Sequence, residues 1–422
     1  MTIKKYGKKL LCRLLENQAK RLIKKNDLKI IAVVGSVGKT STKMAIAKLL
    51  SNQARVNYQD GNYNDRLTVP LVLFDQAEPS IFNLFAWLRI AISNEMALSK
   101  PYNYDISILE LGPDGPNQLK YFSYLKPDLC VLSAIAPEHM EFFKTLDNVA
   151  KEELVPLKFS KQILVNIDDC DAKYLTDLDY KSYGLYTQAD YKMKIHSRHK
   201  LSPQKVSVHF PDKTEIESDI NLVGAQGAKS VLAAIATAKL LNWSNNEIKD
   251  ALKLIVSVPG RMQILKGIND SLIIDDSYNA SPIAVKAALD VLYTQDSPKV
   301  AILGSMNELG PIAKSAHEEI GRYCHKDKLD LLITIGDTAK DFLAPNAIKN
   351  GVTVKSFLSP YEAGEYLSQN IALGSVVLVK GSQNGVYSEE AIKPLLMDAS
   401  DSARLVRQSK YWLKIKQKQF PS

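Results

Sequence analysis

The stretch that decides the fold is Leu28-Lys-Ile-Ile-Ala-Val-Val-Gly-Ser-Val-Gly-Lys-Thr-Ser41. Its first half is a short apolar, β-branched run, which is typical of a buried strand. The glycines end that strand, and a helix is predicted over residues 40–50. A strand, a glycine-rich loop and a helix in this order form a phosphate site, because backbone N–H groups and the helix N-terminus face the anion.

We therefore predict that this loop binds the phosphates of ATP. The residues assigned to it are Gly35, Ser36, Val37, Gly38, Lys39, Thr40 and Ser41. The side chain of Lys39 is expected to reach the β- and γ-phosphates, and the hydroxyl of Thr40 to bind Mg²⁺. The common P-loop has glycine where Val33 stands, so this is a shorter form of the loop.

Further short apolar runs alternate with helical stretches along the chain, which predicts an α/β fold. The predicted strands are residues 105–111, 129–134, 162–166, 272–276, 299–304, 331–336 and 375–380. We place a domain boundary at Val258-Pro259-Gly260, where proline and glycine interrupt the pattern. The prediction is a central ATP-binding domain over 28–257 with a mostly parallel sheet. A Rossmann-like α/β domain over 258–400 and a basic tail over 401–422 follow it.

The two ends of the chain are basic. Residues 1–27 contain nine lysines and arginines against two acidic residues, and the chain carries a formal charge of +8. Over residues 5–25, leucine and isoleucine recur at helical spacing, which predicts an amphipathic helix. Two interpretations stay open: this helix packs its apolar face on the next domain, or it lies on a membrane surface.

Composition excludes several classes of protein. The region between the ends is close to neutral, so a basic groove for nucleic acid is not indicated. The four cysteines have neither metal nor redox spacing. No apolar run is long enough to cross a bilayer, and the basic N-terminus has no apolar signal core. We therefore expect a cytoplasmic protein, whose oligomeric state the sequence does not predict.

Two further candidate residues follow predicted strands. Glu110 closes the strand at 105–111, and His139 lies just after the strand at 129–134. Open α/β sheets bind ligands at the carboxyl ends of their strands, and Mg²⁺ prefers hard oxygen ligands together with phosphates. Glu110 is thus a plausible magnesium ligand, and a histidine beside a nucleotide site is a functional candidate.

Over roughly residues 28–400 the chain resembles the Mur ligase family, in particular its D-alanyl-D-alanine-adding branch. The short loop at 35–41 and the segments around Glu110 and His139 carry part of this resemblance. The other motifs are Gly61-Asn62-Tyr63-Asn64, Val69-Pro70-Leu71, Val258-Pro259-Gly260-Arg261, Asp275-Asp276-Ser277-Tyr278-Asn279-Ala280, Leu303–Gly310 and Val379-Lys380-Gly381-Ser382.

The resemblance implies an ATP- and Mg²⁺-dependent ligase of cell-wall (peptidoglycan) synthesis. The γ-phosphate would move to a carboxylate of a muramoyl-peptide precursor, and the amine of D-Ala-D-Ala would displace it. By the same resemblance, Glu110 and His139 hold Mg²⁺ beside Lys39. Arg261 and Lys380 add positive charge or orientation, while Asn62, Asp276 and Asn279 contact the nucleotide or the amine. A structural interpretation remains for Arg261 as a hinge residue and for Asp276 as a helix cap.

The sequence also departs from the family pattern. Only about 27 residues precede the first strand, so we expect no N-terminal UDP-binding domain. Glu153 stands where many members have a carbamylated lysine, and we hypothesise that its carboxylate serves a second Mg²⁺; a plain surface helix is the alternative. Other readings are a related ligase with a folate or polyglutamate acceptor, or a non-catalytic ATP-binding partner held at the membrane by its basic ends.

Overall fold

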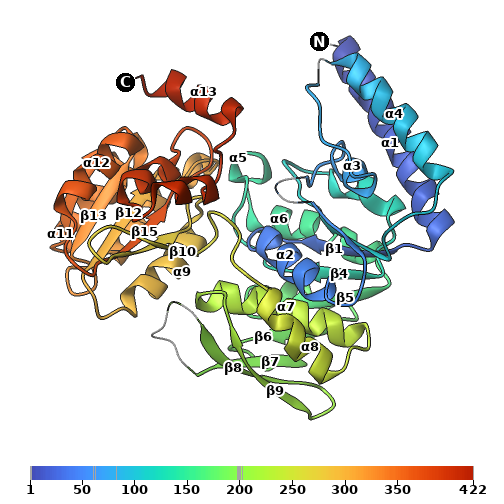
Figure 1. The fold of residues 1–422 in the computed structure, drawn as a ribbon, viewed down its shortest axis with the longest axis horizontal. Coiled ribbons are helices and arrows are strands. Elements are labelled where there is room, and N and C mark those ends of the chain that lie inside the picture. The colour runs from blue at the N-terminus through green and yellow to red at the C-terminus, as the bar shows by residue number, and fades with distance from the viewer. Residues whose placement is uncertain are drawn as a thin grey trace.

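The computed structural model describes residues 2–59, 61, 63–81, 83–196, 201 and 203–421, with the backbone alone for residues 2–6. The chain forms two parts, each built on one β-sheet flanked by helices (Figure 1). The first sheet ends with β9 near residue 220, and the second begins with β10 at residue 263. We keep the boundary at residue 258 as our proposal, because it falls between the two sheets.

The first sheet has the strand order β2-β3-β1-β4-β5-β6-β7-β8-β9 in the described residues. Its strands are β1 Lys29–Val34, β2 Val56–Asn57, β3 Ile106–Glu110, β4 Leu129–Leu132, β5 Gln162–Asn166, β6 Lys181–Gly184, β7 Tyr191–Ile195, β8 Gln204–His209 and β9 Glu215–Ile220. Pairing is parallel from β2 to β7, and β8 and β9 add an antiparallel edge. Because β1 pairs in parallel with both β3 and β4, the carboxyl ends of these three strands lie side by side.

Helices cover both faces of this sheet. On one face, α2 (Lys39–Leu50) packs against α7 (Gly224–Leu240) and forms a core with the strands, while α8 (Asn245–Ala251) lies beside α2. On the other face, α3 (Val69–Leu73) and α6 (Leu146–Glu153) contribute to a second core. The short α5 (Met140–Phe143) follows β4, and 3₁₀ turns occupy Leu119–Tyr124, Pro156–Phe159, Ala172–Tyr174 and Leu252–Leu254.

Two long helices form an arm at one edge of the first part. They are α1 (Thr2–Asn26) and α4 (Leu84–Leu98), which contact each other along their length (Figure 1). Of the apolar residues predicted to form one face of α1, Leu15 and Leu22 are buried, whereas Leu10 and Leu14 remain about half exposed. The packing interpretation therefore holds for part of that face only. No helix among the described residues is both long and apolar enough to cross a membrane.

The second sheet has the order β10-β11-β15-β12-β13-β14. Its strands are β10 Gln263–Lys266, β11 Leu272–Asp275, β12 Lys299–Gly304, β13 Leu331–Ile335, β14 Thr353–Phe357 and β15 Val376–Lys380, and β10 alone of these is antiparallel to its neighbour. The flanking helices are α9 Pro282–Tyr293, α10 Ala313–Tyr323, α11 Ala344–Lys349 and α12 Pro360–Asn370. Short 3₁₀ helices lie at Gly310–Ile312, Ser388–Leu395 and Ala399–Arg404, and a π-helical turn lies at Ala339–Leu343.

The C-terminal segment, predicted as a basic tail, ends in helix α13 (Lys410–Gln419) and packs on the second part. The ammonium of Lys416 is fully buried, 2.8 Å from Glu389 Oε1 and 2.6 Å from Glu390 Oε1. Arg407 donates to the other oxygen of Glu389 and to the backbone carbonyls of Ser277 and Tyr278. The tail thus holds the loop that follows β11.

Candidate active site

The predicted phosphate loop leaves the end of β1 with two glycines in left-handed backbone conformations. Gly35 has φ +122°, and a Cβ there would lie 2.5 Å from Ser133 Oγ and 2.8 Å from backbone atoms of Ala134. Gly38 has φ +85° and precedes the first residue of α2. Only glycine takes such conformations at little cost. The loop therefore depends on glycine at 35 for space and at both positions for backbone shape.

Lys39 begins α2 and points back into the loop. Its ammonium donates to the carbonyl of Gly35 and lies 3.2 Å from both carboxylate oxygens of Glu138. Burial alone lowers the pKa of Lys39, but the carboxylates of Glu138, Glu153 and Glu110 outweigh it and raise that pKa. The lysine is thus held charged beside the loop, where a phosphate would replace Glu138 as its partner.

Glu110 ends β3 next to the loop, as predicted, and is almost fully buried. Its Oε2 lies 3.3 Å from the ammonium of Lys43, and its Oε1 accepts from the side-chain amide of Asn64 at 3.4 Å. Lys43, the fifth residue of α2, was not predicted as a site residue. Its position four residues after Lys39, on the same helix face, was the available signal. The carboxylate is therefore oriented by two side chains.

His139 follows β4 and reaches the second part of the molecule. Its Nδ1 lies 3.1 Å from Glu308 Oε2, and its Nε2 lies 3.7 Å from Glu138 Oε1. The hydrogen bond to Glu308 raises the pKa of His139 in spite of its partial burial. Glu308 lies in the Leu303–Gly310 motif, but its pairing with His139 was not predicted, because sequence spacing does not reveal contacts between domains.

Glu153 lies beneath the phosphate loop rather than on a solvated helix face, so the plain surface-helix alternative is wrong. Its side chain is fully buried, and its Oε2 accepts a hydrogen bond of 2.7 Å from the backbone N–H of Gly35. The other oxygen, Oε1, has no hydrogen-bond partner. Burial raises the pKa of Glu153 to about 7, against the opposing charge of Lys39.

The second part contributes the loop after β11 and the end of β15. Lys380 is buried, donates to Asp276 Oδ2 and to the carbonyl of Asn279 at 2.8 Å, and has its pKa lowered by burial. Asp276 also accepts from the backbone N–H of Met262 at 3.2 Å. Asp276 is thus bound to Lys380 and to the β10–β11 region, and it forms no helix cap.

Arg261 extends from the segment that joins the two parts. Its guanidinium carbon lies 4.2 Å from the centre of the Tyr278 ring, and its Nε is buried without a hydrogen-bond partner. Arg261 lines both cavities described next, so its charge is available to a bound anion.

A cleft between the two parts brings most of the predicted residues together. It encloses about 1140 Å³, part of it open to solvent. Its walls include Ser36, Val37, Gly38, Lys39, Thr40, Glu110, His139, Arg261 and Asn279. Gly35 and Glu153 do not line this cleft. Ser41, Asp276 and Lys380 line the neighbouring cavity, and Asn62 lies outside the described residues.

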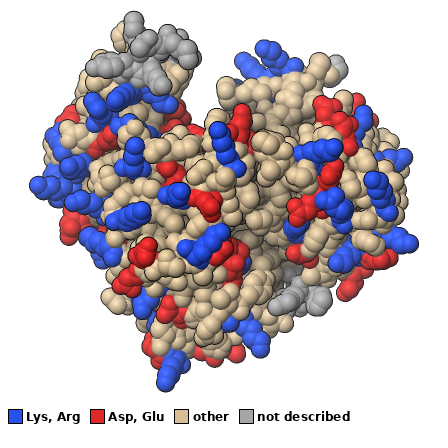
Figure 2. All heavy atoms as spheres, turned by 180° about the vertical axis from the view of Figure 1, so that it is seen from behind, with Lys and Arg blue, Asp and Glu red and all other residues tan. Residues whose placement is uncertain are grey.

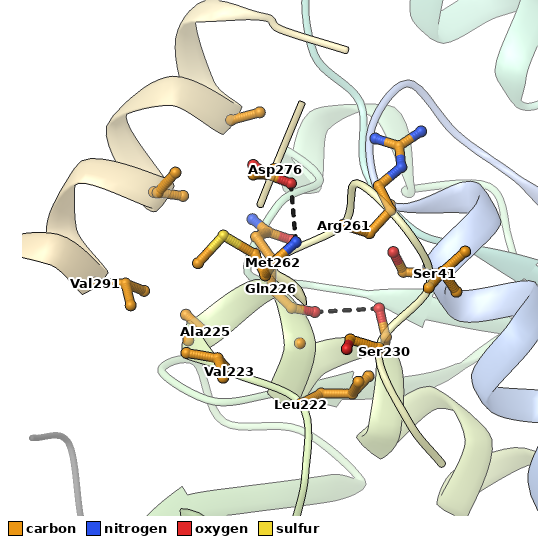
Figure 3. Close-up of a pocket in the computed structure, with 18 of the residues that line it drawn as sticks. Ser41, Leu222, Val223, Ala225, Gln226, Ser230, Arg261, Met262, Asp276 and Val291 are labelled. Atoms are coloured by element: carbon orange, nitrogen blue, oxygen red, sulfur yellow. Dashed lines mark hydrogen bonds between the residues drawn. The ribbon is translucent and has the colours of Figure 1, made fainter. Parts of the chain in front are cut away.

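The neighbouring cavity encloses about 790 Å³ and is mostly apolar (Figure 3). Val37, Gly38 and Ser41 of the loop form one side, and α7 and α9 form the others. Ala225 and Gln226, at the start of α7, line this cavity, Ala225 beside Val223 and Gln226 on the side toward Ser230 (Figure 3). An apolar space directly beside a phosphate loop suits a nucleotide base.

The donor set fits magnesium when phosphates complete it. Glu110 Oε2 is buried and accepts no hydrogen bond, and Thr40 and His139 line the same cleft. Among the described residues no group of three or more His, Cys, Asp or Glu side chains could hold a metal alone. Mg²⁺ takes few protein ligands, so phosphate and water oxygens would complete its coordination here.

Comparisons with known proteins agree with this arrangement. The Mur ligase middle domain matches residues 33–238, and the Mur ligase glutamate ligase domain matches residues 260–383. The UDP-N-acetylmuramoyl-tripeptide–D-alanyl-D-alanine ligase of Bacillus subtilis is 27% identical over 391 residues, which are 90% of this chain and 79% of that protein. The enzyme of the same name from Haemophilus influenzae is 27% identical over 383 residues, covering 87% and 76%.

Solved structures show the same fold. MurF from Acinetobacter baumannii superposes with a TM-score of 0.72 at 23% identity, over 88% of this chain and 77% of that one. The MurF ligase of Thermotoga maritima in complex with ADP gives a TM-score of 0.73 at 21% identity, over 90% and 84%. The predicted family and fold class are confirmed: the chain belongs to the Mur ligase family of ATP-dependent ligases that form amide bonds.

Proposed function

We propose that the protein joins the amine of D-Ala-D-Ala to a carboxylate of a muramoyl-peptide precursor, with ATP converted to ADP and phosphate. The observation that carries this proposal is the cleft itself. Lys39, Glu110 and His139 from the first part face Arg261 and Asn279 from the second across one space. Phosphoryl transfer needs such convergent positive charge and metal-binding groups more than it needs a base.

Each group has a role in this scheme. Lys39 exchanges Glu138 for the phosphates, and the loop N–H groups hold them. Thr40, Glu110 and His139 would hold Mg²⁺, which neutralises charge on the transferred phosphoryl group. The carboxylate of the precursor attacks the γ-phosphorus and becomes an acyl phosphate, while ADP leaves with the electrons of the broken P–O bond. The amine then attacks the acyl carbon, and inorganic phosphate leaves with the C–O bond electrons.

The two parts contribute different functions. The apolar cavity with Ala225 and Gln226 would take the adenine, and Arg261 would orient the acyl phosphate or its precursor carboxylate. The His139–Glu308 contact joins the two walls of the cleft. Such a contact favours a closed cleft, which excludes water from the acyl phosphate.

Glu153 is proposed to supply the carboxylate that serves a second Mg²⁺. Its unpartnered Oε1 supports this role, and its bond to Gly35 ties it to the phosphate loop. With Glu153→Ala, ligation at limiting Mg²⁺ should fall while ligation at saturating Mg²⁺ recovers. Full ligation by this variant at limiting Mg²⁺ would contradict the proposal.

The substrate assignment is supported by the D-alanyl-D-alanine ligases that match most of the chain. We propose the cytoplasm as the site of action, where ATP is available. The test is an assay of phosphate release with ATP, Mg²⁺, a UDP-muramoyl tripeptide and D-Ala-D-Ala, with glutamate plus a folate as the comparison pair. Release with the first pair alone is expected. Release of phosphate with the second pair alone would show that the acceptor is a folate rather than a muramoyl peptide. ATP binding without phosphate release from either pair would indicate a non-catalytic ATP-binding protein.

A further inference from the structure

Helix α4 is apolar on two opposite faces. Trp87, Ile90 and Leu98 are buried on the face that packs against α1 and the body. The opposite face is exposed to solvent over the whole helix. Its large apolar side chains are Leu84, 77% exposed, Phe85, 88%, Leu88, 60%, Ile92, 53%, and Met96, 57%. A soluble helix normally places polar residues on such a face, so this one is equipped for a partner.

Helix α1 extends this exposed face. The two helices run in parallel, because Arg21 pairs with Glu95 and Lys25 donates to the carbonyl of Leu98. Leu14 and Leu10 precede Arg21 by seven and eleven residues, and Leu88 and Leu84 precede Glu95 by the same intervals. Helical periodicity therefore puts the two leucine pairs side by side. We call Leu10, Leu14, Leu84, Phe85, Leu88, Ile92 and Met96 the apolar strip.

Positive charge borders the strip. Lys9, Arg13, Lys20 and Lys24 are exposed on α1, and no ion pair is recorded for them within the described residues. The acids of the arm are already neutralised, since Glu16 pairs with Arg66 and Glu95 with Arg21. Figure 2 shows blue Lys and Arg side chains on the part of the surface just below the grey atoms. The strip is thus apolar along its centre and cationic along one side.

The other end of the chain adds to the same side of the molecule. Helix α13 and the free end of the α1–α4 arm both project upward in Figure 1. Tyr411 of α13 is 68% exposed, and Lys410, Lys414 and Lys418 are exposed around it. Two separate basic, partly apolar helices that project on one side suit a broad planar partner better than a small ligand.

We propose that the apolar strip docks on the surface of an anionic lipid bilayer. Its side chains enter the boundary between headgroups and acyl chains, and the lysines and arginines of α1 contact lipid phosphates. A second copy of this chain is disfavoured as the occupant, because a two-fold interface would bring the same basic borders together. This inference does not depend on the proposed function, since it concerns where the protein lies and not what it catalyses.

The test is co-sedimentation of the full chain with vesicles of phosphatidylcholine containing 30% phosphatidylglycerol, and with pure phosphatidylcholine. We expect binding to the anionic vesicles, weakened about tenfold or more between 50 and 500 mM NaCl. Phe85→Ser combined with Leu88→Ser should weaken it by about tenfold or more. The matched control is Leu373→Ser with Met397→Ser, which are exposed apolar residues of the second part and should leave binding within about twofold.

Charge is tested in the same way. Lys20→Glu with Lys24→Glu should weaken binding to anionic vesicles by about tenfold, whereas Lys213→Glu with Lys249→Glu changes the net charge equally and should not. Unchanged thermal unfolding of each variant shows that it is folded. No vesicle binding at 50 mM NaCl overturns the proposal. An equal loss of vesicle binding in a control variant also overturns it. A dimer seen by light scattering that Phe85→Ser dissociates would overturn it as well and would assign the apolar strip to contact with a second copy of the chain. Phosphate release in vesicle-free solution reports separately on the ligase reaction.

Discussion

The buried ammonium of Lys416 provides the sharpest test of how the C-terminal segment is held. In Lys416→Met the unbranched apolar side chain keeps most of its length but loses its charge. Glu389 and Glu390 then remain buried at 0% and 1% exposure, without the cation that lies 2.8 and 2.6 Å from their Oε1 atoms. Removing one partner of a buried ion pair costs about 3–5 kcal/mol, because the remaining charge is left unsolvated.

Other partners reduce that cost. Arg407 still pairs with Glu389 at 2.6 Å, and Lys393 with Glu390 at 2.6 Å. We therefore expect a loss of about 3 kcal/mol, at the lower end of the range for buried pairs. We expect this loss of stability to appear first as local detachment of α13, because this helix is joined to the rest of the chain at one end only.

The assay is amide hydrogen exchange of residues 410–419, together with urea unfolding followed by the fluorescence of Trp412, which lies against Tyr387. Lys418→Met in the same helix is the control, because Lys418 is exposed. Adding Glu390→Gln to Lys416→Met should recover about 1–2 kcal/mol, since it removes one of the unpaired charges. Equal exchange rates in Lys416→Met and Lys418→Met would refute the reasoning.

Three further predictions concern single sites. Gly35→Ala should abolish ATP binding measured by calorimetry, because its Cβ would lie 2.5 Å from a neighbouring hydroxyl at φ +122°; wild-type affinity would contradict this. Glu152→Gln should destabilise the protein by about 1–3 kcal/mol in urea, since its carboxylate accepts three backbone N–H bonds of 2.7 Å, whereas the exposed Glu141→Gln should not. Burial raises the pKa of Asp275 to about 6. Its protonated carboxyl therefore adds to the free energy of unfolding in full below its unfolded pKa of about 4, and this contribution is lost as the pH rises through 6. The stability of Asp275→Asn relative to wild type should therefore grow by about 1 kcal/mol from pH 5 to pH 8, and a pH-independent difference would count against the buried charge.

Local signals predicted the phosphate loop and the most buried parallel strands, but the parallel strands β2, β6, β7 and β14 were not predicted. Strands β1, β3, β4 and β5 are continuous apolar runs, and such runs are recognisable because both faces of a parallel strand are buried. The loop was recognisable because its glycines have a backbone role that no other residue fills. The antiparallel strands β8 and β9 were not predicted either. Strand β9 is largely exposed and acidic, and β8 is short and mixes polar with apolar residues.

Contacts between distant segments were beyond sequence reasoning. Nothing local in residues 389–416 indicates that Lys416 is buried, because the run of lysines reads as a solvated face. The same limit hid the pairing of His139 with Glu308, which depends on how the two parts meet. For Glu153, the sequence suggested a carboxylate near the metal, and the structure adds its bond to the loop through Gly35.

Because Lys39 pairs with Glu138, an anion that enters the phosphate loop competes with a carboxylate of the protein. The binding energy that an incoming anion gains from Lys39 is reduced by the energy of the Lys39–Glu138 pair, which the anion must break. A single negative charge gains little by this exchange, so chloride, bicarbonate and simple carboxylates are poor occupants. A triphosphate brings several charges to the same loop and wins the exchange. The carboxylate thus acts as a selectivity filter, and neutralising it should make the loop accept smaller anions.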